Sequence, residues 1–196
     1  AEPLHLHLHH VPALEEHRRL AGGADAGRRA GGDHVAGLQG NQPAQVGELV
    51  EAKTYVLPTT NIAAGLAVMV GYDSEGDPDE VVAEMREISD SLRVGEVTRS
   101  VRDAHVGDRE IPEGSYIGFL DGDLIAVEDG ARQAALVIAR KIVDGGADVL
   151  TLLKGEELTE VDLEEIIDGI RDLDGALEVE AKEGGQPLYP LQMVAE

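Results

Sequence analysis

Three histidines near the start of the chain have the spacing of a metal site. If the segment His5 to His10 (HLHLHH) forms a strand, the imidazoles of His5, His7 and His9 share one face. Neutral imidazole is a common zinc ligand. The alternative interpretation is an added or poorly ordered tail, or mis-assigned sequence. We favour that alternative, and expect no metal site in this chain.

Two other groups of side chains have the chemistry of acid–base catalysis. Asp121 and Asp123 flank Gly122 and offer a pair of carboxylates. A tight Asp-Gly hairpin turn explains both residues without catalysis. His105 is the only histidine after residue 34, and its place beside a Gly-Asp turn predicts a surface residue rather than a general base. We therefore assign no catalytic residue.

Binding is better supported than catalysis, at two arginines and one loop. Arg99 and Arg102 are predicted on opposite faces of a strand over residues 96–106, and a guanidinium group suits carboxylate or phosphate recognition. A cross-strand ion pair is the alternative. The segment Gly184 to Pro190 (GGQPLYP) is predicted to be a stiff, shaped loop. It is either an interaction surface or the corner before a last strand.

Composition excludes several classes of partner and site. The chain has 196 residues, with 39 acidic and 16 basic side chains and a formal charge of −23, so nucleic acid and anionic membrane surfaces are disfavoured. The absence of cysteine excludes disulfides, Cys-ligated zinc and a thiol nucleophile. The longest apolar run, residues 62–70, is too short to cross a bilayer, and no signal peptide is evident. We expect a cytoplasmic protein without membrane insertion.

The character of the chain changes near residue 50. Residues 1–53 carry 7 acidic and 5 basic side chains, whereas residues 54–196 carry 32 and 11. The first segment holds six of the seven histidines and shows neither strand nor helix periodicity for long. We therefore treat residues 1–50 as an atypical segment, which is a tail or a truncated or mis-assigned part of a domain.

From residue 53 onward, strands alternate with capped helices. Asp77, Pro78 and Glu80 predict a helix start, followed by an apolar face that ends before Gly95. Asp129 is expected to cap a second long helix, and Thr159 a third. The other predicted elements are strands at 54–57, 116–120, 124–127, 149–153, 177–181 and 191–195 and a short helix at 62–71. The strands at 149–153 and 177–181 should pair in parallel, because one helix connects them.

Several of these segments together resemble a known family. They are residues 95–103 (GEVTRSVRD), 111–118 (IPEGSYIG), the Asp121-Gly122 hairpin, 151–156 (TLLKGE) and 184–190 (GGQPLYP). In this order they resemble the C-terminal region of dihydroxyacetone-kinase-like proteins, of the type of the bacterial fatty acid kinase A subunit. Residues 55–65 (YVLPTTNIAAG) are similar to the end of that family's middle domain.

The resemblance implies that nucleotide binding and partner binding belong to different domains. In the family, an N-terminal helical domain binds ATP and Mg²⁺ through carboxylates, and the C-terminal domain engages a DegV-type fatty-acid-binding protein. The kinase phosphorylates the acyl group that this carrier holds, as a step of phospholipid metabolism. No segment of the chain resembles the ATP-binding domain, so the resemblance implies no cofactor in this chain and no phosphorylation by it alone.

The expected architecture is α+β or α/β, with mixed sheets, flanking helices and two small subdomains. Residues 51–94 correspond by resemblance to the end of the middle domain and residues 95–196 to the partner-binding domain. The docking face is expected to include Arg99, Arg102, Gly185, Gln186 and Tyr189. Two alternatives stay open: a stand-alone phosphotransferase or phosphatase-like enzyme that uses Asp121, Asp123 or His105, and a scaffold that forms a homodimer.

Overall fold

The computed structural model describes residues 5–8, 54–57, 59 and 62–196 of the chain. Strand β1 (His5–Leu8) pairs in parallel with β2 (Thr54–Leu57), with His5 opposite Thr54. A strand, which was the condition for the histidines to share a face, is therefore present at residues 5–8. His9 lies outside the described residues, and so do Thr60 and Asn61, the two residues expected to cap the first helix.

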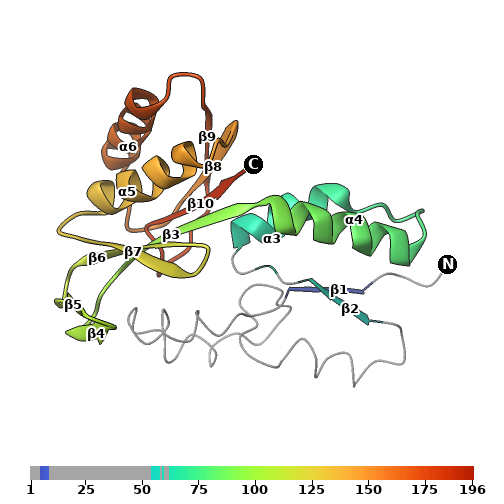
Figure 1. Cartoon of the computed structure of the whole chain (residues 1–196), viewed down its shortest axis with the longest axis horizontal. Coiled ribbons are helices and arrows are strands. Elements are labelled where there is room, and N and C mark those ends of the chain that lie inside the picture. The colour runs from blue at the N-terminus through green and yellow to red at the C-terminus, as the bar shows by residue number, and fades with distance from the viewer. Residues whose placement is uncertain (1–4, 9–53, 58, 60–61) are drawn as a thin grey trace.

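A six-stranded mixed sheet forms the centre of the molecule (Figure 1). Its strand order is β7-β6-β3-β10-β8-β9, and only β8 and β9 pair in parallel. The strands are β3 (Arg93–Arg99), β6 (Tyr116–Leu120), β7 (Asp123–Glu128), β8 (Val149–Lys154), β9 (Glu178–Glu183) and β10 (Leu191–Ala195). The expected parallel pair is confirmed. The last strand, β10, lies between β3 and β8 and is buried along its whole length.

Helices α5 (Ala131–Asp144) and α6 (Glu160–Leu173) cover one face of this sheet. Ile138 of α5 packs where Gly95 and Gly118 leave the sheet without side chains, since a Cβ on Gly95 would lie 2.6 Å from the Ile138 side chain. The helix can therefore approach the strands closely. The core on this face is built from apolar side chains of both helices and of alternate strand residues, among them Ile138, Leu152, Ile166 and Met193.

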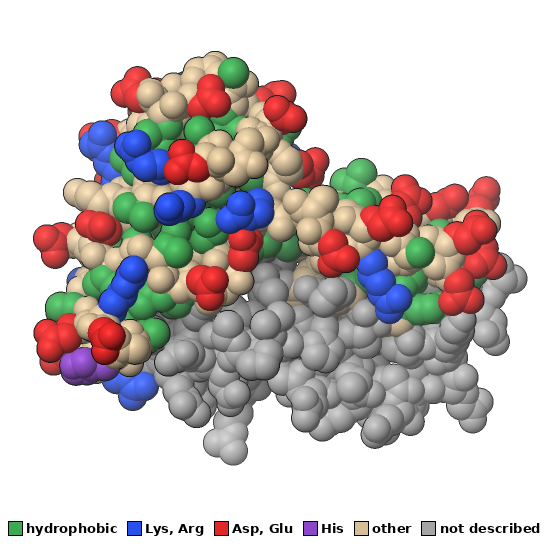
Figure 2. All heavy atoms as spheres, viewed as in Figure 1, with side chains coloured by type: hydrophobic (Ala, Val, Ile, Leu, Met, Phe, Trp, Pro, Cys, Tyr) green, Lys and Arg blue, Asp and Glu red, His purple; other side chains and the backbone are tan. Residues whose placement is uncertain are grey.

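Two further helices pack against the opposite face of the sheet, near one end. They are α3 (Ile62–Val68), which continues as the short helix η2 (Met69–Gly71), and α4 (Pro78–Ser91). Their apolar side chains share a core with Leu153 and Val194, which alternate along their strands with residues of the other core. Exposed acidic side chains gather over α4 (Figure 2). The α+β class with mixed sheets and flanking helices is confirmed.

Helix starts follow the expected pattern in two of three places. The Asp77 carboxylate accepts hydrogen bonds from the N–H groups of Asp79 and Glu80, and the Thr159 hydroxyl accepts one from the N–H of Asp162. The expected cap at Asp129 is wrong, because the N-cap residue of α5 is Gly130, which has no side chain to accept a hydrogen bond. None of the helices in the described part of the chain is long and apolar enough to cross a bilayer.

The strand expected over residues 96–106 is wrong in its second half. β3 ends at Arg99, and β4 (Ala104–Val106) belongs to a separate hairpin with β5 (Arg109–Ile111). The break has a local cause, because the Ser100 hydroxyl donates a hydrogen bond to the carbonyl oxygen of Arg102 at 2.6 Å and closes a turn. Arg99 and Arg102 therefore do not lie on opposite faces of one strand.

Candidate functional site

The loop over residues 184–190, called here the 184–190 loop, is anchored at both ends to the end of β8 and the residue after it. At its start, the first two N–H groups of the loop donate to the carbonyl oxygen of Lys154, at 2.9 and 3.1 Å. At its end, the N–H of Gly155 donates to the carbonyl oxygen of Pro190 at 2.9 Å. The loop is therefore a fixed part of the sheet's end and not a mobile connection.

The middle of the loop is held by Gln186, a buried side chain. Its Nε2 donates to the carbonyl oxygen of Leu153 at 2.9 Å, and its own backbone carbonyl oxygen accepts from the N–H of Glu156 at 3.1 Å. A side chain on Gly184 would overlap the Gln186 amide. Gln186 is therefore an internal support for the loop and presents little surface to a partner.

Gly155 is the residue that lets the loop approach β8. A Cβ at this position would overlap the carbonyl oxygen of Tyr189 and lie 2.7 Å from that of Gln186. Both contacts are with backbone atoms, which cannot move aside without displacing the loop. Sequence reasoning missed this role, although Gly155 lies in one of the segments that carried the family resemblance.

Lys154 fixes the same region through its side chain. Its Nζ lies 2.9 Å from a carboxylate oxygen of Glu160 and 3.2 Å from one of Glu183. Hydrogen bonds that the ammonium group donates to Glu160 first, and then to Glu183, raise the pKa of Lys154, because both carboxylates favour its charged form. The ammonium group thereby links the first turn of α6 to the end of β9.

Tyr189 is half-buried, and the charge of the buried acid Glu96 acts on its phenol. Glu96 is 4% exposed, and its carboxylate accepts a hydrogen bond from Gln192 Nε2 at 3.3 Å. Burial of the phenol, and secondly the negative charge of Glu96, raise the pKa of Tyr189 well above its ordinary value. The phenol is therefore neutral at all physiological pH values.

One hydrogen bond joins the loop to the end of β3. The Thr98 hydroxyl donates to the carbonyl oxygen of Leu188 at 3.0 Å. Thr98 is fully buried, whereas the Leu188 side chain is 38% exposed. This contact brings the exposed part of the loop next to the chain that carries Arg99 and Arg102, and sequence reasoning did not foresee it.

Arg99 and Arg102 are both exposed, but they differ in how they are held. The Arg99 Nε donates to the carbonyl oxygen of Gly114 at 3.2 Å, and its guanidinium carbon lies 5.8 Å from the centre of the Tyr116 ring. The Arg102 side chain forms no ion pair or hydrogen bond with the residues that the structure describes. Arg102 is therefore the cation with the greater freedom to meet a partner.

The predicted docking residues thus divide into two groups. Arg99, Arg102 and Gly185 are exposed at this end of the sheet, with Gly185 in the left-handed backbone conformation at φ +64°. Gln186 is buried and holds the loop in shape, whereas Tyr189 is half-buried. Leu188 is an exposed apolar residue of the same loop that the sequence reasoning did not include.

Two of the three residues considered for catalysis, Asp121 and His105, make contacts with neighbouring side chains, and the third, Asp123, is exposed at the start of β7. The Asp121 carboxylate accepts from Arg93 Nε at 2.6 Å and from the N–H of Val94 at 2.8 Å, within a hairpin turn where its own φ is +52°. His105 is exposed and lies 3.6 Å from Glu110. Within the described residues, no group of three or more His, Asp or Glu side chains could hold a metal ion.

Comparison with known proteins assigns the family. A sequence model for the C-terminal part of proteins like the A subunit of fatty acid kinase matches residues 42–196. The chain belongs to this family. The resemblance inferred from the sequence segments is thereby confirmed, and the match begins inside the segment that we treated as atypical.

The curated relatives of this chain are much longer proteins. Protein YloV of Bacillus subtilis is 25% identical over 152 residues, which are 78% of this chain and 28% of that protein. The uncharacterized protein SERP0792 of Staphylococcus epidermidis is 28% identical over 145 residues, which are 74% of this chain and 26% of that protein. The chain thus spans about a quarter of the length of these relatives.

Solved structures similar to this family member share its fold at low sequence identity. The DegV family protein Cg2579 of Corynebacterium glutamicum matches with a TM-score of 0.54 at 11% identity, over 100% of this chain and 97% of that one. The fatty acid kinase (Fak) B3 protein of Streptococcus pneumoniae, solved loaded with linoleic acid, matches with a TM-score of 0.52 at 12% identity, over 78% and 65% of the two chains. The fold is therefore of the DegV type.

Proposed function

We propose that this chain is the part of a fatty acid kinase A subunit that docks a DegV-type fatty-acid-binding protein, in the cytoplasm. ATP and Mg²⁺ would bind to a separate domain, which phosphorylates the acyl group that the docked protein presents. The family assignment supports the kinase role, and the end of the sheet proposed here for docking lies within residues 95–196. The alternative of a stand-alone enzyme has no support from Asp121 or His105, given the structural contacts described above.

The observation that carries the proposal is the tethering of an exposed loop to the end of β3. The Thr98–Leu188 hydrogen bond joins the loop to the segment that ends in Arg102, and Gly155 and Gln186 hold the loop against β8. A preformed surface loses little conformational entropy when a partner binds. Leu188 and Arg102 are both exposed, and apolar residues and arginines are frequent in interface centres.

The Arg102→Ala variant tests this proposal. We expect it to weaken binding to the fatty-acid-loaded DegV-type protein of the same organism by about tenfold, because exposed arginines at interface centres are frequent energetic anchors. Isothermal titration calorimetry on the full chain measures the dissociation constant. Folding should be unaffected, since the Arg102 side chain has no partner among the described residues.

Arg86→Ala is the matched control, because it removes the same charge from an exposed position on α4. We expect the control to bind as tightly as the parent chain. An equal loss in both variants would show a general electrostatic effect. Unchanged affinity in Arg102→Ala would remove Arg102 from the docking face.

A second role, as a dimerisation scaffold, is favoured by one surface. Four apolar side chains spaced along α3 and η2 are exposed: Ile62, Leu66, Met69 and Val70, of which Leu66 is 60% and Val70 85% exposed. An apolar stripe of this kind commonly marks a protein contact. We expect light scattering to give the mass of a dimer for the parent chain and of a monomer for Leu66→Asp. A monomeric parent chain would rule this role out.

A further inference from the structure

The turn over residues 100–103, called here the 100–103 turn, leads from β3 into the β4–β5 hairpin and is tied to the chain that returns toward β6. Ser100 donates one backbone hydrogen bond to residues 114–115 and accepts another from them, at 2.8 Å each. The Asp103 carboxylate accepts a hydrogen bond from the N–H of Glu113 at 2.8 Å. Together with the hydroxyl bond of Ser100 described above, these contacts leave the backbone of the turn little freedom.

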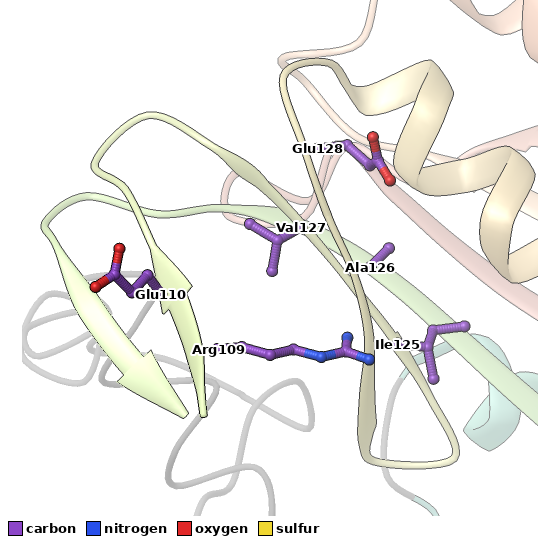
Figure 3. Close-up of a pocket in the computed structure, with 6 residues that line it drawn as sticks. All are labelled: Arg109, Glu110, Ile125, Ala126, Val127 and Glu128. Atoms are coloured by element: carbon purple, nitrogen blue, oxygen red, sulfur yellow. The ribbon is translucent and has the colours of Figure 1, made fainter. Parts of the chain in front are cut away.

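The hairpin that follows the 100–103 turn is itself held against the sheet. Ile111 of β5 is buried in an apolar cluster with Ile117 and Phe119 of β6. The Nη1 of Arg109 donates to the carbonyl oxygen of Leu124 at 3.3 Å, and Figure 3 shows this side chain reaching from β5 toward β7. The turn is therefore fixed on both sides, by β3 before it and by the packed hairpin after it.

Val101 is an apolar residue that this fixed turn leaves exposed. Its side chain is 52% exposed and belongs to none of the apolar clusters in the part of the chain that the structure describes. Outside α3 and η2, the described residues include only three exposed large apolar side chains, those of Val101, Val161 and Leu188. Val161 lies in the first turn of α6. Val101 follows the strand to which Thr98 ties the backbone of Leu188, so these two belong to the proposed docking end.

We propose that Val101 is the apolar anchor of the docking surface and inserts into an apolar pocket of the DegV-type protein. The inference rests on the proposed function and adds the kind of surface that the partner presents to this turn. A β-branched side chain on a fixed backbone loses little conformational entropy when a protein pocket buries it. A membrane is a poorer occupant, because a single valine buries little area and the formal charge of −23 opposes contact with anionic lipids.

Isothermal titration calorimetry of the full chain with the fatty-acid-loaded DegV-type protein tests this inference. Val101→Asp should weaken binding by about fiftyfold, because the pocket would then have to bury a carboxylate. Val101→Thr keeps the shape of the side chain and replaces one methyl group by a hydroxyl, so it should weaken binding by about fivefold. Val161→Asp, the same change at the exposed valine of α6, is the matched control and should bind like the parent chain.

The outcomes separate this inference from the proposed function. If Arg102→Ala weakens binding and Val101→Asp does not, docking at this end stands and the anchor is not Val101. Equal losses in the two aspartate variants, or parent-like binding by Val101→Thr, would also overturn the apolar anchor. A lower mass of Val101→Asp in light scattering would place Val101 between two copies of the chain and overturn it as well. No binding by the parent chain would overturn both proposals. Circular dichroism should show Val101→Asp folded, since this side chain lies outside the apolar clusters of the described residues.

Discussion

Replacing Gly155 by alanine should lower the free energy of unfolding by about 3 kcal/mol and displace the 184–190 loop. The new methyl group would overlap the Tyr189 carbonyl oxygen and crowd that of Gln186. Relief requires the loop to move away from β8, which breaks the hydrogen bond from Gly155 to Pro190. Urea unfolding followed by circular dichroism measures the loss, and hydrogen exchange of residues 184–190 reports the displacement.

Gly175→Ala is the matched control for this prediction. The only atom near a Cβ at residue 175 is the carbonyl oxygen of Arg171, at an ordinary contact distance of 3.9 Å. We expect a change within about 0.5 kcal/mol. If Gly155→Ala is as stable as Gly175→Ala and its loop exchanges no faster, the close packing of the loop on β8 is not what holds it.

The second large effect is a loss of stability in alkali that depends on Tyr189. The pKa of this phenol is raised in the folded chain, chiefly by burial, so the unfolded chain loses its proton first as the pH rises. The free energy of unfolding is therefore unaffected by this phenol below about pH 10, the ordinary tyrosine pKa. Above that pH, the ionisation of Tyr189 in the unfolded chain lowers the free energy of unfolding by up to about 1.4 kcal/mol per pH unit. Urea unfolding at several pH values between about 9 and 12 measures the slope.

Tyr189→Phe isolates this effect from the titration of lysines. The variant keeps the ring and has no group to ionise, and no partner of the hydroxyl is found among the described residues. We therefore expect the difference in unfolding free energy between the two proteins to change with pH only above about pH 10. A constant difference up to about pH 12 would mean that the phenol is not buried beside Glu96.

Local signals in the sequence were sufficient to predict most of the helices and strands. Asp77 and Thr159 cap the helices they were predicted to cap, because an N-cap needs only a side-chain oxygen two or three residues ahead of free N–H groups. The single helix between β8 and β9 correctly predicted their parallel pairing. Both arguments depend on residues close together in the chain.

Long-range arrangement was not predictable in the same way. Nothing in residues 191–195 indicates that the last strand pairs with both β3 and β8 in the middle of the sheet. The expected strand over residues 96–106 failed because a single hydroxyl, that of Ser100, favours a turn over continued pairing. The alternation of apolar and polar residues does not show whether a side-chain hydrogen bond will end a strand.

For the candidate site, the sequence identified the loop but not its support. Two glycines and two prolines marked residues 184–190 as shaped, whereas Thr98 and Gly155 gave no individual signal. Their roles depend on contacts between segments that are far apart in the chain. Tyr189 was expected in the docking face as part of this stiff loop, and the structure leaves it half-buried.

The most direct test of docking at this end of the sheet is a hydrogen-exchange footprint of the bound partner. The full chain is saturated with the fatty-acid-loaded DegV-type protein, and exchange is compared with that of the free chain. Slower exchange is expected in residues 98–103 and 184–190, with α5 and α6 unchanged. Protection confined to α5 and α6, with both of those segments unaffected, would contradict the account.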